Sequence, residues 1–203
     1  MLRKSESIRN RYTLMEAAQL GFWLFRTKCC CRNARLFCYP FDLRGRRYVD
    51  FGKSLTLGRG CRFDVFDNQR GTPSLVFGEH VQLNDYVHLV AMDSITIGSH
   101  VLMASHIFIS DNSHGSYKGD ALDSDPTTPP IKRDYPTAPV SIGDNTWICE
   151  GVVIMPGTRI GKGCVIGAHS IVRGEIPDYT VAAGNPAKVI KQYDFDKQRW
   201  VRV

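Results

Sequence analysis

The histidine at position 114 is the side chain with the clearest potential for acid–base chemistry. It lies in the segment IFISDNSHGSYKG (107–119), directly before a long polar stretch. An imidazole has an ordinary pKa of about 6.5, so it can take a proton from a hydroxyl or an amine near neutral pH. Asp111 or a backbone carbonyl could orient its second ring nitrogen. The alternative is a surface histidine without a role.

The elements that must position His114 show an unusual period. In the C-terminal half an aliphatic residue recurs every six positions, at Ile142, Ile148, Ile154, Ile160, Ile166 and Val172. A small or aliphatic residue lies two positions before most of them, at Thr146, Val152, Thr158, Cys164 and Ser170. Neither a helix nor a simple strand has this period. It predicts a chain that turns a corner after each unit and stacks coils of about eighteen residues.

The same period continues upstream through Phe77, Leu83, Leu89, Ile97, Met103 and Ile109, with an irregular beginning at Leu57 and Phe63. Two segments interrupt it. One is DNQRGTP (67–73), and the other is the long Pro-, Asp- and Gly-rich stretch 115–139. A break of this length inside a regular coil is expected to be a loop that leaves one corner, and such loops often carry function. His114 is the last residue before it.

The remaining histidines raise the question of a metal site. They are His80, His88, His100, His106 and His169, and they fall in different repeat units. Three histidines on adjacent coils could bind zinc. However, His100 and His106 are one unit apart in the same coil, so they are expected on different faces, and we expect no metal site. The seven cysteines form no regular framework, which favours a reducing compartment.

The basic character of the chain belongs to its N-terminal arm. The whole sequence has a formal net charge of +6, whereas residues 1–48 contain 11 Lys or Arg and 3 Asp or Glu. Residues 9–26 have a polar stripe at helical spacing, with apolar residues over much of the rest, and predict a helix. The apolar run 20–25 is far too short to span a bilayer. Either the helix packs on the end or side of the stacked coils, or it rests on an anionic membrane surface, and the two are compatible. No motif supports nucleic-acid binding.

The repeats, the DNSHG segment, the run SIGDNTWICEGVVIMPGTRIGKGCVIGAHSIV and the closing VAAGNPAKVI resemble the hexapeptide-repeat acyltransferases. Within them the chain is most similar to the galactoside and maltose O-acetyltransferase branch, and more closely to bacterial polysaccharide O-acetyltransferases. The resemblance implies a mainly β fold, a left-handed parallel β-helix, a homotrimer, and acetyl-coenzyme A as donor. We therefore expect a basic helical arm at 1–48, the β-helix at 49–192 with the loop 115–139 inserted, and a tail or short C-terminal helix at 193–203.

The resemblance also implies roles for individual residues. His114 matches the general base, and Asn84, which lies thirty residues earlier, matches a second active-site residue. Positions that match the coenzyme groove or its phosphate contacts are Trp147, Glu150, Gly167, Ala168, Arg173, Gly184, Lys188 and Lys191. Glu150 departs from the family's usual small residue. The structural alternatives are turn residues for the glycines and Asn84, a solvated face for the lysines, and a cover of the core edge for Trp147.

With these residues, the resemblance implies an acetyl-coenzyme A-dependent O-acetyltransferase that acts on a sugar hydroxyl of a bacterial surface polysaccharide or of its lipid-linked precursor. The transfer would be direct, with an acceptor pocket near Asp93, Tyr117 and Lys118. The enzyme would be cytoplasmic, with peripheral contact to the inner membrane as an option for the arm. Alternatives are a small sugar, amino sugar or amino acid as acceptor, or a non-catalytic assembly protein.

Overall fold

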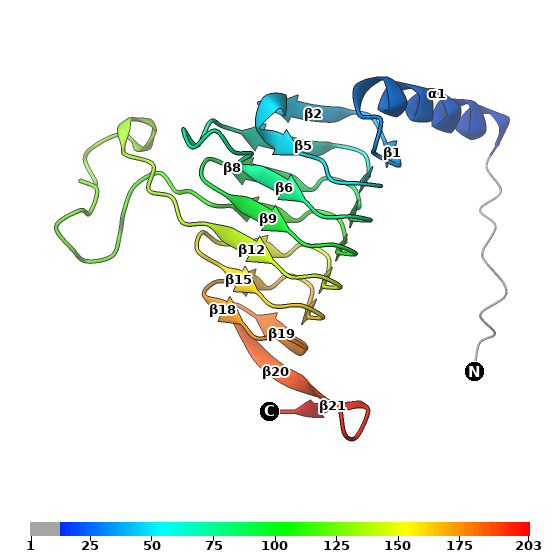
Figure 1. Ribbon diagram of the computed structural model, residues 1–203. Coiled ribbons are helices and arrows are strands. Elements are labelled where there is room, and N and C mark those ends of the chain that lie inside the picture. Colours follow the sequence, from blue (N-terminus) through cyan, green and yellow to red (C-terminus); the bar gives the residue numbers. More distant parts are fainter. Residues whose placement is uncertain (1–12) are drawn as a thin grey trace.

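The computed structural model describes residues 13–203, and most of them form a parallel β-helix with three flat sides (Figure 1). The chain passes from sheet A to sheet B to sheet C in each coil and then begins the next coil. Sheet A contains β1 (Leu36–Phe37), β4 (Thr56–Leu57), β7 (Gln82–Leu83), β10 (Leu102–Met103), β13 (Trp147–Ile148), β16 (Val165–Ile166), β19 (Thr180–Gly184), β20 (Ala187–Asp194) and β21 (Arg199–Arg202).

The other two sides have six strands each. Sheet B contains β2 (Phe41–Arg44), β5 (Cys61–Val65), β8 (His88–Ala91), β11 (Phe108–Ser110), β14 (Val153–Ile154) and β17 (Ile171–Val172). Sheet C contains β3 (Val49–Asp50), β6 (Leu75–Phe77), β9 (Ile95–Ile97), β12 (Val140–Ile142), β15 (Arg159–Ile160) and β18 (Glu175–Ile176). Two short 3-10 helices lie between strands, η1 (Arg46–Tyr48) and η2 (Pro130–Lys132).

The six-residue period of the sequence is the inward side of this coil. The aliphatic residues from Ile142 to Val172 are at most 3% exposed. The polar residues in the companion position are buried as well, and their hydroxyls bond corner carbonyls. Thr146 Oγ1 donates to Gly161 O over 2.9 Å, and Ser170 Oγ donates to Gly167 O over 2.7 Å. The period therefore specifies both a continuous aliphatic core and the satisfaction of backbone groups at its corners.

The corners between sheets form three edges. The A–B edge consists of 38–40, 58–60, 84–87, 104–107, 149–152 and 167–170. The B–C edge consists of 45–48, 66–74, 92–94, 111–139, 155–158 and 173–174. Both interruptions of the period, 67–73 and 115–139, therefore leave the β-helix at the same B–C edge. The longer one projects far from the coils (Figure 1).

Corner geometry accounts for four of the six histidines. His80, His100, His106 and His169 all have a φ between +56° and +59°, the left-handed conformation that a tight corner needs. The His80 and His100 rings stack at 5.2 Å, in successive coils of the same edge. No group of three or more His, Cys, Asp or Glu side chains that could hold a metal ion occurs within residues 13–203.

Helix α1 (Leu14–Cys30) lies beside β1 at the N-terminal end of the coils, and its N-terminal part extends outward from them (Figure 1). Thr13 caps it, because its hydroxyl accepts from Glu16 N while Glu16 Oε2 accepts from Thr13 N over 2.8 Å. The predicted helix 9–26 is confirmed for its described part, but it runs on to Cys30, and residues 9–12 lie outside the described range. No helix of the described residues is long and apolar enough to cross a membrane.

Two predicted boundaries need correction. The coil begins before residue 49, because Leu36 pairs with Thr56 and Phe41 pairs with Cys61 as regular parallel rungs. The expected C-terminal helix is wrong, because residues 187–202 form the antiparallel hairpin of β20 and β21 on the open end of sheet A. The hairpin pairs Tyr193 opposite Trp200, with ring centroids at 5.2 Å. Cross-strand aromatic contact and the free edge of β19 together favour a strand.

Candidate active site

His114 lies at the B–C edge, where the chain leaves β11 for the long loop. Its side chain is exposed, and its Nδ1 lies 3.3 Å from the carbonyl oxygen of Pro130 in η2. A carbonyl can only accept, so this contact assigns the proton to Nδ1 and leaves Nε2 free to accept one. The Tyr135 ring packs edge-on against the imidazole at 4.7 Å. The loop therefore orients the histidine that precedes it.

The loop is braced by its own polar contacts. Tyr117 Oη donates to the carbonyl of His114 over 2.6 Å, and Arg133 Nη1 donates to Tyr117 Oη over 2.6 Å. Arg133 also donates to the carbonyls of Thr128 and Pro126. Tyr117 and Lys118, which we expected beside the acceptor, line a hollow of about 250 Å³ at the base of the loop. Tyr117 thus contacts His114 through the backbone.

His114 itself borders a second hollow of about 230 Å³ on the outer side of sheet B. Its floor is mostly apolar and includes Phe108, Ile154 and Met155, and His88 lies at its rim. A histidine that is free to accept a proton can deprotonate a hydroxyl bound in the neighbouring hollow. The apolar lining of the hollow limits the access of bulk water to that hydroxyl. This is the chemistry that the B–C edge offers.

His88 has no catalytic or binding role predicted from sequence, yet its ring, like that of His114, is fixed by a hydrogen-bonding contact. Its Nε2 lies 3.1 Å from Asp64 Oδ2, and Arg62 Nε donates to the same oxygen over 2.8 Å. Burial alone would raise the pKa of Asp64, but the hydrogen bond with His88 and the guanidiniums of Arg62 and Arg44 lower it overall. The outward positions of paired strands, Arg62 beside His88, are the sequence signal that could have revealed this cluster.

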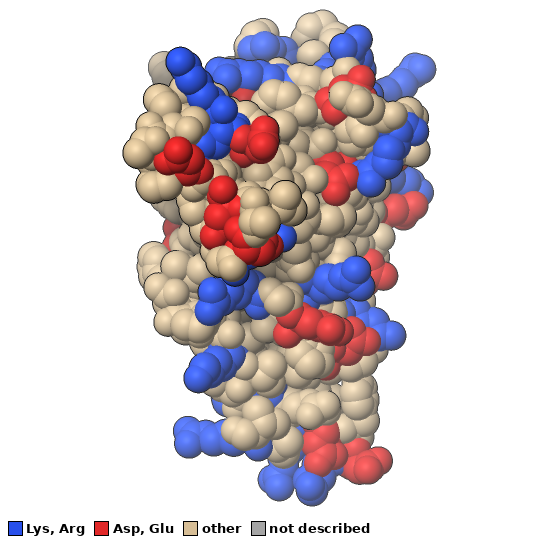
Figure 2. All heavy atoms as spheres, turned by 90° about the vertical axis from the view of Figure 1, so that its left-hand side faces the viewer, with Lys and Arg blue, Asp and Glu red and all other residues tan. Residues whose placement is uncertain are grey.

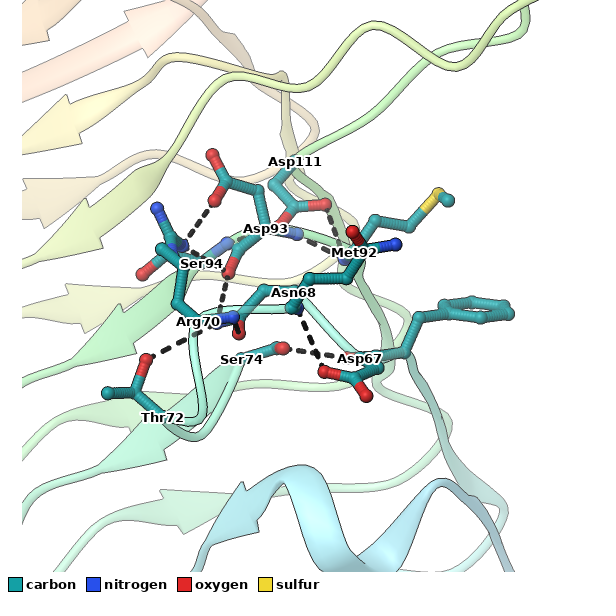
Figure 3. Close-up of polar contacts among 11 residues, drawn as sticks. Asp67, Asn68, Arg70, Thr72, Ser74, Met92, Asp93, Ser94 and Asp111 are labelled. Atoms are coloured by element: carbon teal, nitrogen blue, oxygen red, sulfur yellow. Dashed lines mark hydrogen bonds and ion pairs between the residues drawn. The ribbon is translucent and has the colours of Figure 1, made fainter.

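Asp111 does not orient His114. It is completely buried, and its carboxylate accepts the backbone N–H groups of Met92, Asp93 and Ser94 at 2.8–3.1 Å (Figure 3). Of the two orienting groups left open by the sequence, the structure therefore shows the backbone carbonyl. Asp111 holds the 92–94 corner, which lies one coil above the loop.

Asp93, expected near the acceptor, is engaged by the shorter insertion. Its carboxylate pairs with the guanidinium of Arg70, and its carbonyl accepts from Asn68 Nδ2 over 3.1 Å (Figure 3). The insertion 67–73 thus fastens onto the corner that Asp111 supports. Asp93 is not among the residues that line the hollow beside His114.

The donor-side candidates gather around sheet A and the A–B edge. Trp147 points outward from β13 and is 48% exposed, between Leu102 and Val165 of the neighbouring strands. Lys188 and Lys191 are exposed on β20, which extends the same sheet. An exposed aromatic side chain and two free ammonium groups on one sheet can accommodate a chain of mixed apolar and anionic character.

Glu150 is an ordered member of the A–B edge. Its carboxylate accepts from Ser105 N and pairs with His106 Nδ1, both over 2.9 Å. The hydrogen bond with His106 and then that of Ser105 hold the pKa of Glu150 below its usual range. The side chain is still 46% exposed, so it keeps a face toward solvent.

Two of the glycines have structural causes of their own. A Cβ on Gly167 would lie 2.8 Å from the Cβ of Ala183, so glycine is required there by the stacking of the next coil. Gly184 has a φ of +108°, which other residues rarely adopt. Ala168 follows Gly167 at the same corner. Arg173 lies apart from this group, exposed at the B–C edge.

Asn84 lies at the A–B edge and His114 at the B–C edge, so the strands of sheet B separate them. A crossing of four or five residues spans roughly 13–17 Å. Asn84 Oδ1 accepts from Gln82 Nε2 over 3.2 Å. Within one chain, therefore, the two predicted catalytic residues are not brought together.

Charges of both signs are interspersed over the side of the molecule that carries the loop (Figure 2). Lys and Arg side chains alternate with Asp and Glu along the B–C edge and around the loop, and no continuous basic area covers this side. Such a surface gives no footprint for a nucleic-acid backbone there.

Comparison with known proteins places the chain among the acetyltransferases with this architecture. Residues 139–174 match the family described as Bacterial transferase hexapeptide (six repeats). The chain is 41% identical over 190 residues to WbbJ of Escherichia coli K12, covering 94% of this chain and 95% of WbbJ. The name of WbbJ as an O-acetyl transferase of lipopolysaccharide biosynthesis is itself provisional.

Two solved structures share the fold at higher than 25% identity. A maltose O-acetyltransferase from Clostridium difficile 630 superposes with a TM-score of 0.53 at 32% identity, over 73% of this chain and 72% of that one. A galactoside acetyltransferase in complex with coenzyme A superposes with a TM-score of 0.54 at 27% identity, over 70% and 67%. The chain therefore belongs to the hexapeptide-repeat acetyltransferase family. It has the predicted left-handed parallel β-helix, and it is an acyltransferase.

Proposed function

We propose that this protein transfers the acetyl group of acetyl-coenzyme A to a sugar hydroxyl of a bacterial surface polysaccharide or of its lipid-linked precursor. The observation that carries the proposal is His114, with its Nδ1 proton directed at Pro130 O and its Nε2 left free beside the hollow on sheet B. The 41% identity to WbbJ over nearly the whole chain supports the choice of a polysaccharide acceptor.

The residues of the chain divide between donor and acceptor. Acetyl-coenzyme A is the co-substrate of the family. We assign its binding to the A–B edge and sheet A. Trp147 would lie along the pantetheine arm, and the backbone of Gly167, Ala168 and Gly184, with Glu150, would border it. Lys188 and Lys191 would pair with its phosphates. Arg173 lies on the opposite edge, so we assign it to the groove only as a residue of a neighbouring chain.

In the reaction, His114 Nε2 takes the proton of the acceptor hydroxyl, whose oxygen then bonds to the thioester carbonyl carbon. The bond from that carbon to sulfur breaks, and the imidazolium returns its proton to the leaving thiolate, so no net proton is consumed. Acetyl-coenzyme A supplies an activated acetyl group to this step. Burial raises the pKa of the Cys149 thiol and raises that of Cys61 to about 11, which disfavours either cysteine as a nucleophile.

The acceptor would occupy the hollow beside His114, with Phe108 as an apolar platform and the fixed ring of His88 as a hydrogen-bonding group. Tyr117 and Lys118 would close over it from the loop. Asp93 is paired with Arg70 outside this hollow, so we assign it no direct contact with the acceptor.

The separation of Asn84 from His114 supports a homotrimer. In a threefold arrangement the A–B edge of one chain meets the B–C edge of the next when sheet B of each chain faces the threefold axis. Asn84 of one chain would then lie beside His114 of another. The enzyme would act in the cytoplasm, and peripheral contact with the inner membrane would bring it to a lipid-linked precursor.

The test is acetyl transfer by the purified protein to a panel of glycans, small sugars, amino sugars and amino acids, followed through the release of free coenzyme A thiol. We expect turnover with glycan hydroxyls and a loss of about 10²–10⁴ in kcat for His114→Asn. The matched control is His80→Asn, at a corner remote from the hollow. Near-normal turnover of His114→Asn would reject the base, and turnover with amines alone would favour the alternative acceptor class.

A further inference from the structure

Helix α1 is attached to the β-helix by one side only. Its buried residues are Trp23 and Thr27. Thr27 Oγ1 donates to the carbonyl of Trp23 over 2.7 Å and accepts from Phe37 N over 2.8 Å, and the Arg59 guanidinium lies 5.1 Å from the Trp23 ring. These contacts fix which face of the helix is turned toward the coils and which is turned away.

The opposite face is apolar and open to solvent. At 100° per residue, it contains Leu14, Met15, Ala18, Phe22, Phe25 and Cys29, which we call the α1 stripe. The large side chains of the stripe are 57–92% exposed. Scattered surface hydrophobics need no explanation, but a continuous stripe along four turns of one helix indicates a contact surface.

Basic residues border the α1 stripe on both sides. Arg26 follows it on one side and Lys28 on the other, and the only acidic residue within α1 is Glu16, near its N-terminus. Arg46 adds a further positive charge at the other end, where its guanidinium donates to the carbonyl of Cys30. An apolar stripe with basic borders is the composition of a helix that lies in the interface of an anionic bilayer.

We propose that the α1 stripe docks on the surface of a membrane that contains anionic lipids. A second copy of the chain is a poorer occupant, because two identical stripes face to face would bring their basic borders together. Helix α1, which carries the stripe, lies at the N-terminal end of the coil stack (Figure 1). In a threefold assembly all three stripes share that end, so they would bind one membrane together with added avidity. The inference rests on the proposed function in one respect, which is that a lipid-linked acceptor would lie in the membrane to which the stripe binds.

The test is co-sedimentation of the full-length protein with vesicles of phosphatidylcholine alone or with phosphatidylglycerol. We expect binding to the anionic vesicles, much weaker binding to neutral ones, and a decrease when salt rises from about 0.1 M to about 0.5 M. The double variant Phe22→Ser, Phe25→Ser should bind at least about tenfold more weakly, since both rings would enter the lipid.

The matched control is Phe66→Ser, which removes the same kind of side chain at 47% exposure from the B–C edge. It should bind vesicles as the wild type does. Both variants should keep the thermal unfolding temperature and the acetyl transfer rate on a water-soluble acceptor, which separates this inference from the proposed reaction. Equal vesicle binding by wild type and the double variant would overturn it. A lower mass of the double variant in sedimentation equilibrium would assign the stripe to a contact between chains and would also overturn it.

Discussion

His114 Nδ1 lies within 3.3 Å of the carbonyl oxygen of Pro130, a residue sixteen positions further along the chain. A side chain at the beginning of the loop is thus oriented by the backbone in its second half. Because the partner is a main-chain group, its position depends on the fold of the whole loop rather than on one side chain. The loop 115–139 therefore serves the base directly, in addition to any contact with the acceptor.

Replacing Arg133 by alanine should disturb this orientation. The Arg133 guanidinium joins Tyr117 Oη to the carbonyls of Thr128 and Pro126, so its loss releases both halves of the loop. We expect kcat to fall about tenfold and the KM of the acceptor to rise, because a misplaced base loses effective concentration. The KM of acetyl-coenzyme A should not change. Steady-state kinetics with each substrate varied in turn measures both, with the neighbouring Lys132→Ala as control. A change confined to acetyl-coenzyme A would contradict the assignment.

The stacked coils could be predicted from sequence because their inward positions repeat at fixed spacing, and the resemblance to a family then implied the left-handed β-helix. Every pair of inward residues six positions apart, such as Ile142 and Ile148, shows the same period. The period can therefore be recognised even though some units are irregular. The C-terminal hairpin could not be predicted in this way. Its pairing depends on the free edge of β19, which exists only once the coils have formed. Local sequence near Tyr193 has no such periodicity.

For the site, His114 could be predicted because it is a titratable residue at the point where the period stops. The hydrogen-bond partners of the residues around His114 could not be predicted. Asp64 and His88 are 24 residues apart and meet because successive coils place them on adjacent strands. Asp111 was an equally good candidate to orient His114 by sequence distance, and only the three-dimensional course of the 92–94 corner shows that its oxygens are already used.

Asp111→Ala should destabilise the fold by about 2–4 kcal/mol, because it leaves three backbone N–H groups without their acceptor in a buried corner. Asp111→Asn should cost less, since one acceptor oxygen remains. Urea unfolding followed by circular dichroism gives the free energies. The control is Asp134→Ala, at an exposed position of the loop. Equal stabilities of Asp111→Ala and Asp134→Ala would show that the corner does not depend on this carboxylate.

The stabilising effect of Asp64 should depend on pH. Because the pKa of Asp64 is lower in the folded protein than in the unfolded chain, its contribution is complete above the unfolded value of about 4. It is lost as the pH falls through the lower, folded value. We expect Asp64→Asn to be less stable than wild type by about 2 kcal/mol at pH 7, with a difference that shrinks in more acidic solution. Thermal unfolding at about pH 7, 5 and 3 tests this. A difference that grows on acidification would have the wrong sign.

The position of Asn84 and His114 on opposite edges of sheet B predicts complementation between two inactive variants. If each site takes His114 from one chain and Asn84 from the next, a mixture of His114→Asn and Asn84→Ala chains contains sites with both residues intact. A trimer that contains both kinds of chain has about one complete site in three. The two variants, purified together by different tags after co-expression so that only mixed trimers remain, should recover about a third of wild-type turnover per site, whereas each alone stays inactive. If both residues acted within one chain, every site in the mixture would lack one of them. The mixture would then remain as inactive as the separate variants.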